Sequence, residues 1–304
     1  MNIGYACINM TLRDQDIFTS RSMIKRTFAS KGPKYASQLA LKNSQDLLTI
    51  VKWNEEHGIK FFRVSSGIFP WASEYKLEDL PDFAEIRLTL EEVGSYVKSV
   101  GQRLTAHPGP FNKLTSPRPD VIRNTYKDLI THGEMFDLMC LERSPYAKIN
   151  IHVGASYGDK PMACRNFNKN FKGLPESVRS RLTVENDDRA SLYSTKELKS
   201  VIYEEIGIPI VFDYHHHGFC TGEQTEREAL ETAISTWPDG ITPVVHFSES
   251  RAKEKNDSSI KANAHSDYVY GPVNTYGYDV DIMVEAKMKE WAIFKWMRLH
   301  GVTE

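Results

Sequence analysis

One pattern of hydrophobic and polar positions recurs along the chain: a short apolar run ends abruptly in a histidine or an acidic residue, and the chain then turns polar. The clearest case is the run at residues 208–212, which leads directly into Asp213 and then His216. The same pattern ends at His107, His152, Glu185, His246 and Glu285. Short apolar runs bounded by polar turns are typical of buried strands. Successive endpoints lie 28 to 45 residues apart, which leaves room for a strand, a helix and two loops in each interval.

The full pattern predicts eight strands separated by helices. The strands are expected at residues 3–8, 60–65, 103–107, 148–153, 182–185, 208–212, 242–246 and 282–285. Helical spacing of apolar residues predicts helices at residues 39–57, 86–100, 121–139, 198–206 and 225–237, and a closing helix that contains Trp291 and Trp296. Ser194 and Glu197 fit a capping box in front of one of them. We therefore expect an α/β protein in which residues 1–304 form a single (β/α)8 TIM-barrel domain.

Two connections are unusually long for a compact domain and are expected to be loops. The first follows the opening strand and carries basic residues from Arg13 to Lys31, and the second extends over residues 154–173 with basic residues from Lys160 to Lys172. Long loops are often functional, and clustered positive charge can contact phosphates. Two interpretations of these residues stay open: a phosphate-contacting rim, or ordinary solvated loops.

Composition narrows the class of protein. The net charge of −2 gives no global basic field, so a polyanionic partner would have to meet a local basic face. The four cysteines are scattered without a CxxC pair, which favours reduced thiols inside a cell. No apolar run approaches the roughly 20 residues of a membrane span, and the first strand leaves no room for a signal peptide. We expect an intracellular monomer without membrane contact, cytoplasmic in a prokaryote or nuclear in a eukaryote.

The acidic residues and histidines at the strand ends would meet at one face of such a barrel. Unpaired acids buried together cost several kcal/mol unless a cation neutralises them. The set is large enough for two or three divalent ions, and nitrogen and oxygen ligands without thiolate favour Mn²⁺, Zn²⁺ or Fe²⁺ over Mg²⁺ or Ca²⁺. Such clusters typically hydrolyse phosphate esters. The alternative is a metal-dependent sugar isomerase or epimerase, which needs fewer ligands than this chain offers.

Several short motifs together resemble one known family. They are Gly4-Tyr5, Arg63-Val64-Ser65-Ser66 with Phe69-Pro70, His107-Pro108-Gly109, Ile151-His152-Val153-Gly154, Val184-Glu185-Asn186-Asp187, Asp213-Tyr214-His215-His216, Val245-His246-Phe247-Ser248 and His265-Ser266-Asp267-Tyr268. As a set they are similar to the UV damage endonuclease (UvdE) family, from residue 3 to about residue 289. No single motif is specific by itself.

The resemblance implies a barrel similar to endonuclease IV that binds a cluster of divalent ions, usually Mn²⁺. It implies nicking of damaged double-stranded DNA immediately 5′ of ultraviolet photoproducts, namely cyclobutane dimers and 6-4 photoproducts, and of some other lesions, which leaves a 3′-hydroxyl. The metal ligands it implies are His107, His152, Glu185, Asp213, His216, His246, His265 and Glu285, with Glu185, His246 and Glu285 as the catalytic residues. The residues expected at the DNA or the lesion are Tyr5, Asn9, Pro110 and Phe111.

Three positions depart from the family pattern. Pro110 stands where the family has a glutamine, Glu74 where many members have a histidine, and Val244 where some have a lysine. The metal chemistry is expected to survive these changes, whereas the mode of lesion recognition stays open. A lesion-binding protein with weak catalysis is a further alternative. His215 and His217 flank His216 in what we expect to be an extended segment, so they should point away from the metals.

Overall fold

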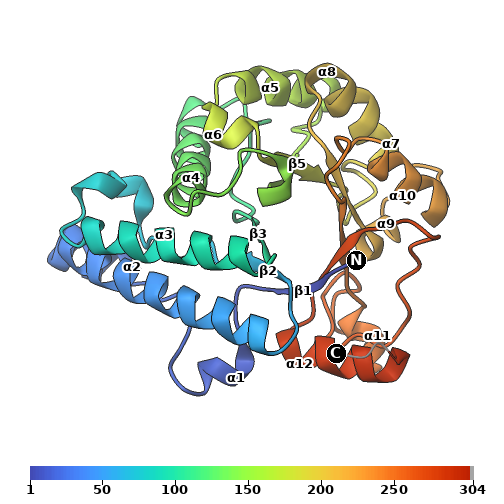
Figure 1. The fold of residues 1–304 in the computed structure, drawn as a ribbon. Helices are drawn as coiled ribbons and strands as arrows, with labels where there is room; N and C mark the ends of the chain where they lie inside the picture. Colours follow the sequence, from blue (N-terminus) through green and yellow to red (C-terminus); the bar gives the residue numbers. More distant parts are fainter. Residues whose placement is uncertain (302–304) are drawn as a thin grey trace.

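Eight parallel strands close into a barrel in which each strand pairs with the next along the chain and β8 pairs with β1. The structure is a computed structural model and describes residues 1–301. The strands are β1 (Ile3–Ala6), β2 (Phe61–Val64), β3 (Arg103–Ala106), β4 (Ile149–His152), β5 (Leu182–Glu185), β6 (Ile210–Asp213), β7 (Val244–Phe247) and β8 (Asp281–Val284). This architecture confirms the predicted (β/α)8 fold (Figure 1).

Helices surround the barrel and occupy the connections between strands (Figure 1). They are α1 (Met10–Arg13), α2 (Lys25–Glu56), α3 (Phe83–Ser99), α4 (Pro119–Leu138), α5 (Lys160–Lys172), α6 (Glu176–Arg179), α7 (Thr195–Leu198), α8 (Glu204–Ile206), α9 (Tyr214–His217), α10 (Glu226–Ile234), α11 (Arg251–Lys255) and α12 (Lys289–His300). A π-helical turn at Lys199–Tyr203 joins α7 to α8, and short 3-10 turns lie at Ala72–Glu74, Leu77–Asp79 and Pro145–Ala147. The capping box of Ser194 and Glu197 is present at α7, as predicted.

Barrel closure depends on close backbone approach between β1 and β2. A Cβ atom at Gly4 would lie 2.2 Å from the carbonyl oxygen of Phe61, so only glycine fits at this register position. On the other side of β1, Ile3 pairs with Ile282 and Tyr5 pairs with Val284. The first strand therefore completes the ring between its two neighbours.

The barrel interior is layered along its axis. At the amino ends of the strands, the fully buried Arg103 guanidinium lies 2.9 Å from Asp281 and also donates to the carbonyl oxygen of Thr242. Above this ion pair is an apolar layer of Phe61, Val211, Val244 and Met283, together with Ala6 and Trp237. A polar layer follows, in which Thr183 donates to Asn150. The packed interior is thus polar at both ends, with an apolar layer between them.

Both long connections expected to be loops contain helix. Helix α2 begins at Lys25, well before the predicted start at residue 39, and is interrupted at Gly32 (φ 62°, ψ −162°), next to Pro33. Residues 160–172 form α5, whose buried side chains Ala163, Cys164, Phe167 and Phe171 follow helical spacing. The prediction of two irregular loops was wrong because sparse apolar stripes are sufficient when each helix packs only one side against the barrel.

None of the helices in the described part of the chain is both long and apolar enough to span a membrane. All four cysteines are free thiols, as predicted, and two of them, Cys164 and Cys220, are buried.

The ion pair at the amino end of the barrel generates a stability prediction. Arg103→Met leaves the Asp281 carboxylate buried without its partner, so we expect a loss of about 3–5 kcal/mol in the free energy of unfolding, measured by urea denaturation. Arg118→Met breaks an exposed ion pair with Asp120 and serves as the control, with no measurable change expected. Equal stability of the two variants would contradict a structural role for Arg103.

Candidate metal centre

The eight predicted ligands lie together at the carboxyl end of the barrel, which is where parallel strands deliver their terminal side chains. Four of them end β4, β5 and β6 or lie within β7: His152, Glu185, Asp213 and His246. His107 and Glu285 directly follow β3 and β8. His216 comes from α9, and His265 comes from the β7–β8 connection, where its neighbourhood is fixed by a bridge to Ser250.

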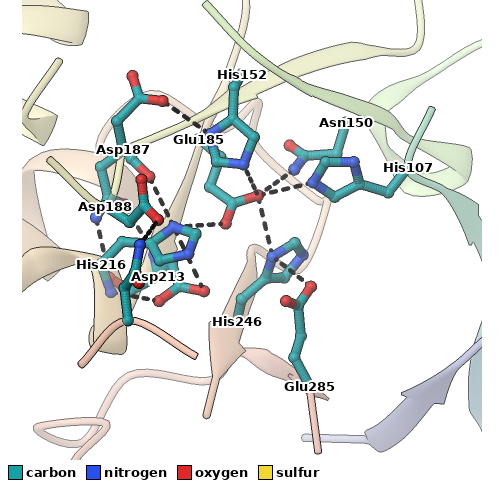
Figure 2. A network of polar contacts seen from close by, with 12 residues as sticks. His107, Asn150, His152, Glu185, Asp187, Asp188, Asp213, His216, His246 and Glu285 are labelled. Atoms are coloured by element: carbon teal, nitrogen blue, oxygen red, sulfur yellow. Dashed lines mark hydrogen bonds and ion pairs between the residues drawn. The ribbon is translucent and has the colours of Figure 1, made fainter. Parts of the chain in front are cut away.

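Glu185 is the centre of this cluster, and four imidazoles surround its buried carboxylate (Figure 2). Its Oε2 atom lies 3.2 Å from His107 Nε2, 3.1 Å from His246 Nδ1 and 4.0 Å from His152 Nε2. Its Oε1 atom lies 3.2 Å from His216 Nδ1. Asn150 donates a hydrogen bond of 2.5 Å to Oε2 from the barrel interior and so fixes the orientation of the carboxylate.

Three of these histidines have one ring nitrogen facing Glu185 and the other facing an outer partner. His107 Nδ1 lies 3.1 Å from the carbonyl oxygen of Pro108, so its Nε2 atom is free to face inward. His152 Nδ1 lies 3.1 Å from Asp187. Outer partners of this kind orient metal-ligating imidazoles and set which nitrogen is available. The arrangement would suit the binding of a cation.

His246 has a less usual outer partner. Its Nε2 atom lies 3.3 Å from the amino group of Lys148, and both side chains are fully buried. Burial is the largest cause that lowers the pKa of Lys148, to about 7. Because Nδ1 of His246 faces Glu185 and Glu285, Lys148 holds the ring from the opposite side.

Glu285 forms the second edge of the centre. It lies 3.2 Å from His246 Nδ1 and 3.4 Å from His265 Nδ1, and it accepts a hydrogen bond from Arg63. Burial opposes ionisation of Glu285, but the positive charge of Arg63 and the imidazole of His246 outweigh burial and hold its pKa well below the usual range. Arg63 therefore keeps this ligand charged.

Asp213 and His216 form the third edge. Asp213 Oδ1 caps α9 by accepting from the backbone N–H of His216, whereas the buried Oδ2 atom has no hydrogen-bond partner within residues 1–301. Burial raises the pKa of Asp213 to about 7, and the charges of Glu185 and Glu285 act in the same direction although His216 opposes them. The His216 imidazole, whose Nδ1 atom lies 3.8 Å from Oδ2, is the counter-charge beside this carboxyl group, and it does not outweigh burial.

The electrostatics and the unpartnered atoms fit divalent cations. Glu185, Asp213 and His246 offer one ligand set within 4.8 Å of one another, and Glu185 with His107 and His152 offers another. His246 Nδ1, like Asp213 Oδ2, is buried without a hydrogen bond among the described residues. Burying such groups costs several kcal/mol unless a cation or a partner compensates for it. Oxygen and imidazole donors without thiolate suit Mn²⁺, Zn²⁺ or Fe²⁺.

His215 and His217 lie beside the cluster without joining it, although the segment is a helical turn and not the extended chain that we predicted. His217 packs against Phe212 with ring centroids 5.4 Å apart, and His215 packs edge-on against Phe219 at 5.2 Å. Successive side chains in a helix are rotated by about 100°, so a turn of helix directs the three histidines to three different sides.

The residues predicted to contact DNA have two different environments. Tyr5 and Asn9 are fully buried: the Tyr5 hydroxyl donates to Asn54 and accepts from Asn9, and Asn9 caps α1. Neither offers a surface that DNA could contact, so both are left out of the interface that we propose below. Pro110 and Phe111 lie in the exposed turn after β3, and Phe111 is 87% exposed.

The other two departures from the family pattern also have clear environments. Glu74 is an exposed residue of a 3-10 turn, where its carboxylate accepts from the Ser73 hydroxyl. Val244 belongs to the buried apolar layer of the barrel. Sequence reasoning missed the supporting roles of Arg63, Lys148, Asn150 and Asp187. A polar or charged residue within or beside a buried strand was the available signal for each of them.

The family model, the curated relatives and one solved structure indicate the same family. The family model described as UV-endonuclease UvdE matches residues 1–304. The UV-damage endonuclease of Schizosaccharomyces pombe is 37% identical over 97% of this chain, which spans 50% of that longer protein. The UV DNA damage endonuclease of Bacillus pumilus is 33% identical over 96% of this chain and 91% of its own length. The crystal structure of SacUVDE is similar with a TM-score of 0.84 and 28% identity, and the match covers 99% of this chain and 98% of that one.

The central position of Glu185 generates a prediction about metal content. Glu185→Gln keeps the size of the side chain but removes the charge, so we expect at least one ion fewer per chain after incubation with Mn²⁺, and a smaller rise in melting temperature on Mn²⁺ addition. Elemental analysis and thermal unfolding measure the two quantities. Glu56→Gln makes the same change at the exposed end of α2 and should behave as wild type. Unchanged metal content in Glu185→Gln would remove Glu185 from the centre.

Proposed function

The chain belongs to the UV-endonuclease UvdE family, and from this premise we propose that it is a metal-dependent DNA repair endonuclease that nicks damaged duplex DNA immediately 5′ of ultraviolet photoproducts. The observation that carries the proposal is the buried Glu185 carboxylate among four imidazoles at the catalytic end of a barrel. Cyclobutane dimers and 6-4 photoproducts are the proposed lesions, and intact duplex is the competing substrate.

The proposed ligands of the metal cluster are the eight residues that meet at this end: His107, His152, Glu185, Asp213, His216, His246, His265 and Glu285. Mn²⁺ is the proposed metal, with two or three ions in the cluster. Ions held there would lower the pKa of a water nucleophile and neutralise the charge that develops on the phosphate and on the departing 3′-oxygen. The proposed product ends are a 3′-hydroxyl and a 5′-phosphate.

The exposure of the ligands indicates from which side a phosphate approaches. The side chains of His107, His152 and His265 are 18%, 22% and 28% exposed, whereas Asp213 and His246 are closed to solvent. The three exposed histidines therefore line the entrance, and the buried residues form the floor. We assign the catalytic role to Glu185, His246 and Glu285. His246 Nδ1 contacts both carboxylates, so these three residues form a continuous set of polar contacts across the floor of the site.

The surrounding residues keep that floor in one geometry. Arg63 holds Glu285 ionised, Asn150 fixes Glu185, and Lys148 supports His246 from below. Groups held in place before substrate arrives do not have to reorganise during the reaction, which is where much of the catalytic effect of such sites originates.

The proposed DNA-binding rim is smaller than the sequence indicated. Arg21 is held by Asp46, and Lys160 is held by Glu197. Lys169 and Lys172 lie in the last turn of α5, at the opposite end of the barrel from the metal centre. Lys25, Arg26 and Lys31 remain exposed near the start of α2, so we restrict this part of the rim to those three residues.

Phe111 is the proposed wedge at the lesion. It lies four residues after His107 in the turn that leaves β3, and its ring is almost fully exposed. Photoproducts weaken base stacking, and an apolar side chain can enter such a step while bases leave the helix. Pro110 has no side-chain donor, but it fixes the backbone that presents the ring.

A nicking assay tests the proposed function. A 5′-labelled duplex that contains one cyclobutane dimer should be cut once, 5′ of the dimer, by the Mn²⁺-loaded protein, and a polymerase should extend the product if its end is a 3′-hydroxyl. Glu185→Gln and chelation by EDTA should each abolish the cut, and the undamaged duplex should stay intact. Tight binding to the damaged duplex without a cut would support a lesion-binding protein, and turnover of a free sugar would support an isomerase.

Phe111→Ala tests the wedge. We expect the variant to keep its metals and its melting temperature, because the ring is exposed, but to lose about 1–3 kcal/mol of preference for damaged over intact duplex, because stacking is removed. The ratio of the two dissociation constants measures this preference. Leu88→Ala removes an exposed apolar side chain from α3 and serves as the control. A lower melting temperature with an unchanged ratio would show that Phe111 only packs the loop.

A further inference from the structure

Lys113 is held at an unusual position beside the metal centre. It lies two residues after Phe111 in the connection between β3 and α4, and its backbone N–H donates to the Thr125 hydroxyl of α4. Its carbonyl oxygen accepts from the N–H of Ser116 and closes a turn. Both backbone polar groups of Lys113, its N–H and its carbonyl oxygen, are therefore hydrogen-bonded. These bonds fix the position of the Cα atom from which the side chain extends.

The side chain folds over a glycine that leaves room for it. A Cβ atom at Gly154 would lie 2.6 Å from Lys113 Nζ and 2.7 Å from Lys113 Cδ, so any larger residue would displace the amine. Gly154 also has φ +88°, a conformation that side chains rarely adopt. Gly154 follows His152 by two residues. The amine therefore packs against the loop that comes directly after His152, which lines the entrance to the proposed metal centre.

The Lys113 amine has no ion-pair or hydrogen-bond partner at this position among residues 1–301. Lys113 is half-buried, and no carboxylate lies within 4.0 Å of Nζ and no acceptor bonds it among residues 1–301. Burial lowers the pKa of Lys113; the charge of Asp187 opposes this shift, and that of Arg189 adds to it. Most surface lysines extend into water, whereas this one is partly desolvated without compensation. An anion at this place would recover the lost interaction.

We propose that Lys113 binds a backbone phosphate of the DNA strand adjacent to the scissile phosphate, on the β3–β4 side of the metal centre. The inference rests on the proposed function and adds a positioning residue to it. The amine comes from the same connection as the exposed Phe111 and lies against the loop that follows His152. In this proposal the strand that carries the scissile phosphate passes over both features. A lysine ammonium suits this role because it binds phosphate as a point charge without selecting a base.

Lys113→Met tests the assignment through the salt dependence of DNA binding. Fluorescence anisotropy with Mn²⁺-loaded protein, between 50 and 200 mM salt, on undamaged duplex and on damaged duplex that carries a non-cleavable linkage 5′ of the lesion, should show a slope of log affinity against log salt reduced by about 1. Affinity should fall roughly three- to tenfold for both duplexes, because a phosphate contact is blind to the lesion. Lys113→Arg should recover most of the slope. Lys98→Met removes the same charge at the other end of the barrel, in the last turn of α3, and should leave the slope unchanged.

Gly154→Ala provides a second route that leaves the lysine in the chain. The added Cβ atom should expel the amine and reduce the slope as Lys113→Met does, and the double variant should show no further loss. Circular dichroism identifies a variant that fails to fold, in which case the Lys113 variants decide the outcome alone. An unchanged slope in Lys113→Met, with wild-type protein that binds and nicks damaged duplex, overturns this inference only. A wild-type protein that binds no duplex at any salt overturns the proposed function as well.

Discussion

The burial of acidic side chains without matching positive charge is the constraint on which the rest of this structure depends. Parallel strands bring their carboxyl ends to one face, and in this chain that face receives Glu185, Asp213 and Glu285 together. Arg63 compensates Glu285, whereas within residues 1–301 Asp213 has the imidazole of His216 beside it and no lysine or arginine. Cations in the proposed cluster would supply the positive charge that Asp213 needs, so we expect metal binding and the stability of this end of the barrel to be coupled.

The two ends of the barrel use charged residues in opposite ways. At the amino end, Arg103 and Asp281 neutralise each other, and backbone carbonyl oxygens take the remaining donors of the guanidinium. At the carboxyl end, Asp213 Oδ2 and His246 Nδ1 stay without hydrogen bonds in the described chain. The apolar layer between them keeps the two polar systems apart. Stability is therefore concentrated at one end, and the unsatisfied ligand atoms that chemistry requires are concentrated at the other.

The strand ends and their ligands could be predicted because strand period and parallel topology act locally and repeat. The supporting contacts could not, since Lys148 reaches His246 across 98 positions of sequence and only the closed ring sets that distance. The burial of Tyr5 has a simpler reason. Alternate residues of a strand face opposite sides, and Ala6 points to the interior cluster, so Tyr5 must point outward, where it packs against Phe62 and bonds Asn54 of α2. The apolar residues in 160–172 are spaced as in a helix, but the many lysines and asparagines between them resemble the composition of a loop.

The connection between β3 and α4 combines order with exposure in a way that folding alone does not explain. Asn112 bonds Asp128 and the carbonyl oxygen of Gly109, and the backbone of Lys113 bonds Thr125, so the loop is anchored to α4. An exposed phenylalanine at Phe111 contributes little to folded stability, because its ring stays in water. The anchored loop nevertheless fixes the backbone from which the ring projects, so a ligand would not have to bear the entropy of ordering that backbone. An ordered backbone under an exposed aromatic ring suits the proposed recognition of a distorted duplex, and packing of the barrel does not require it.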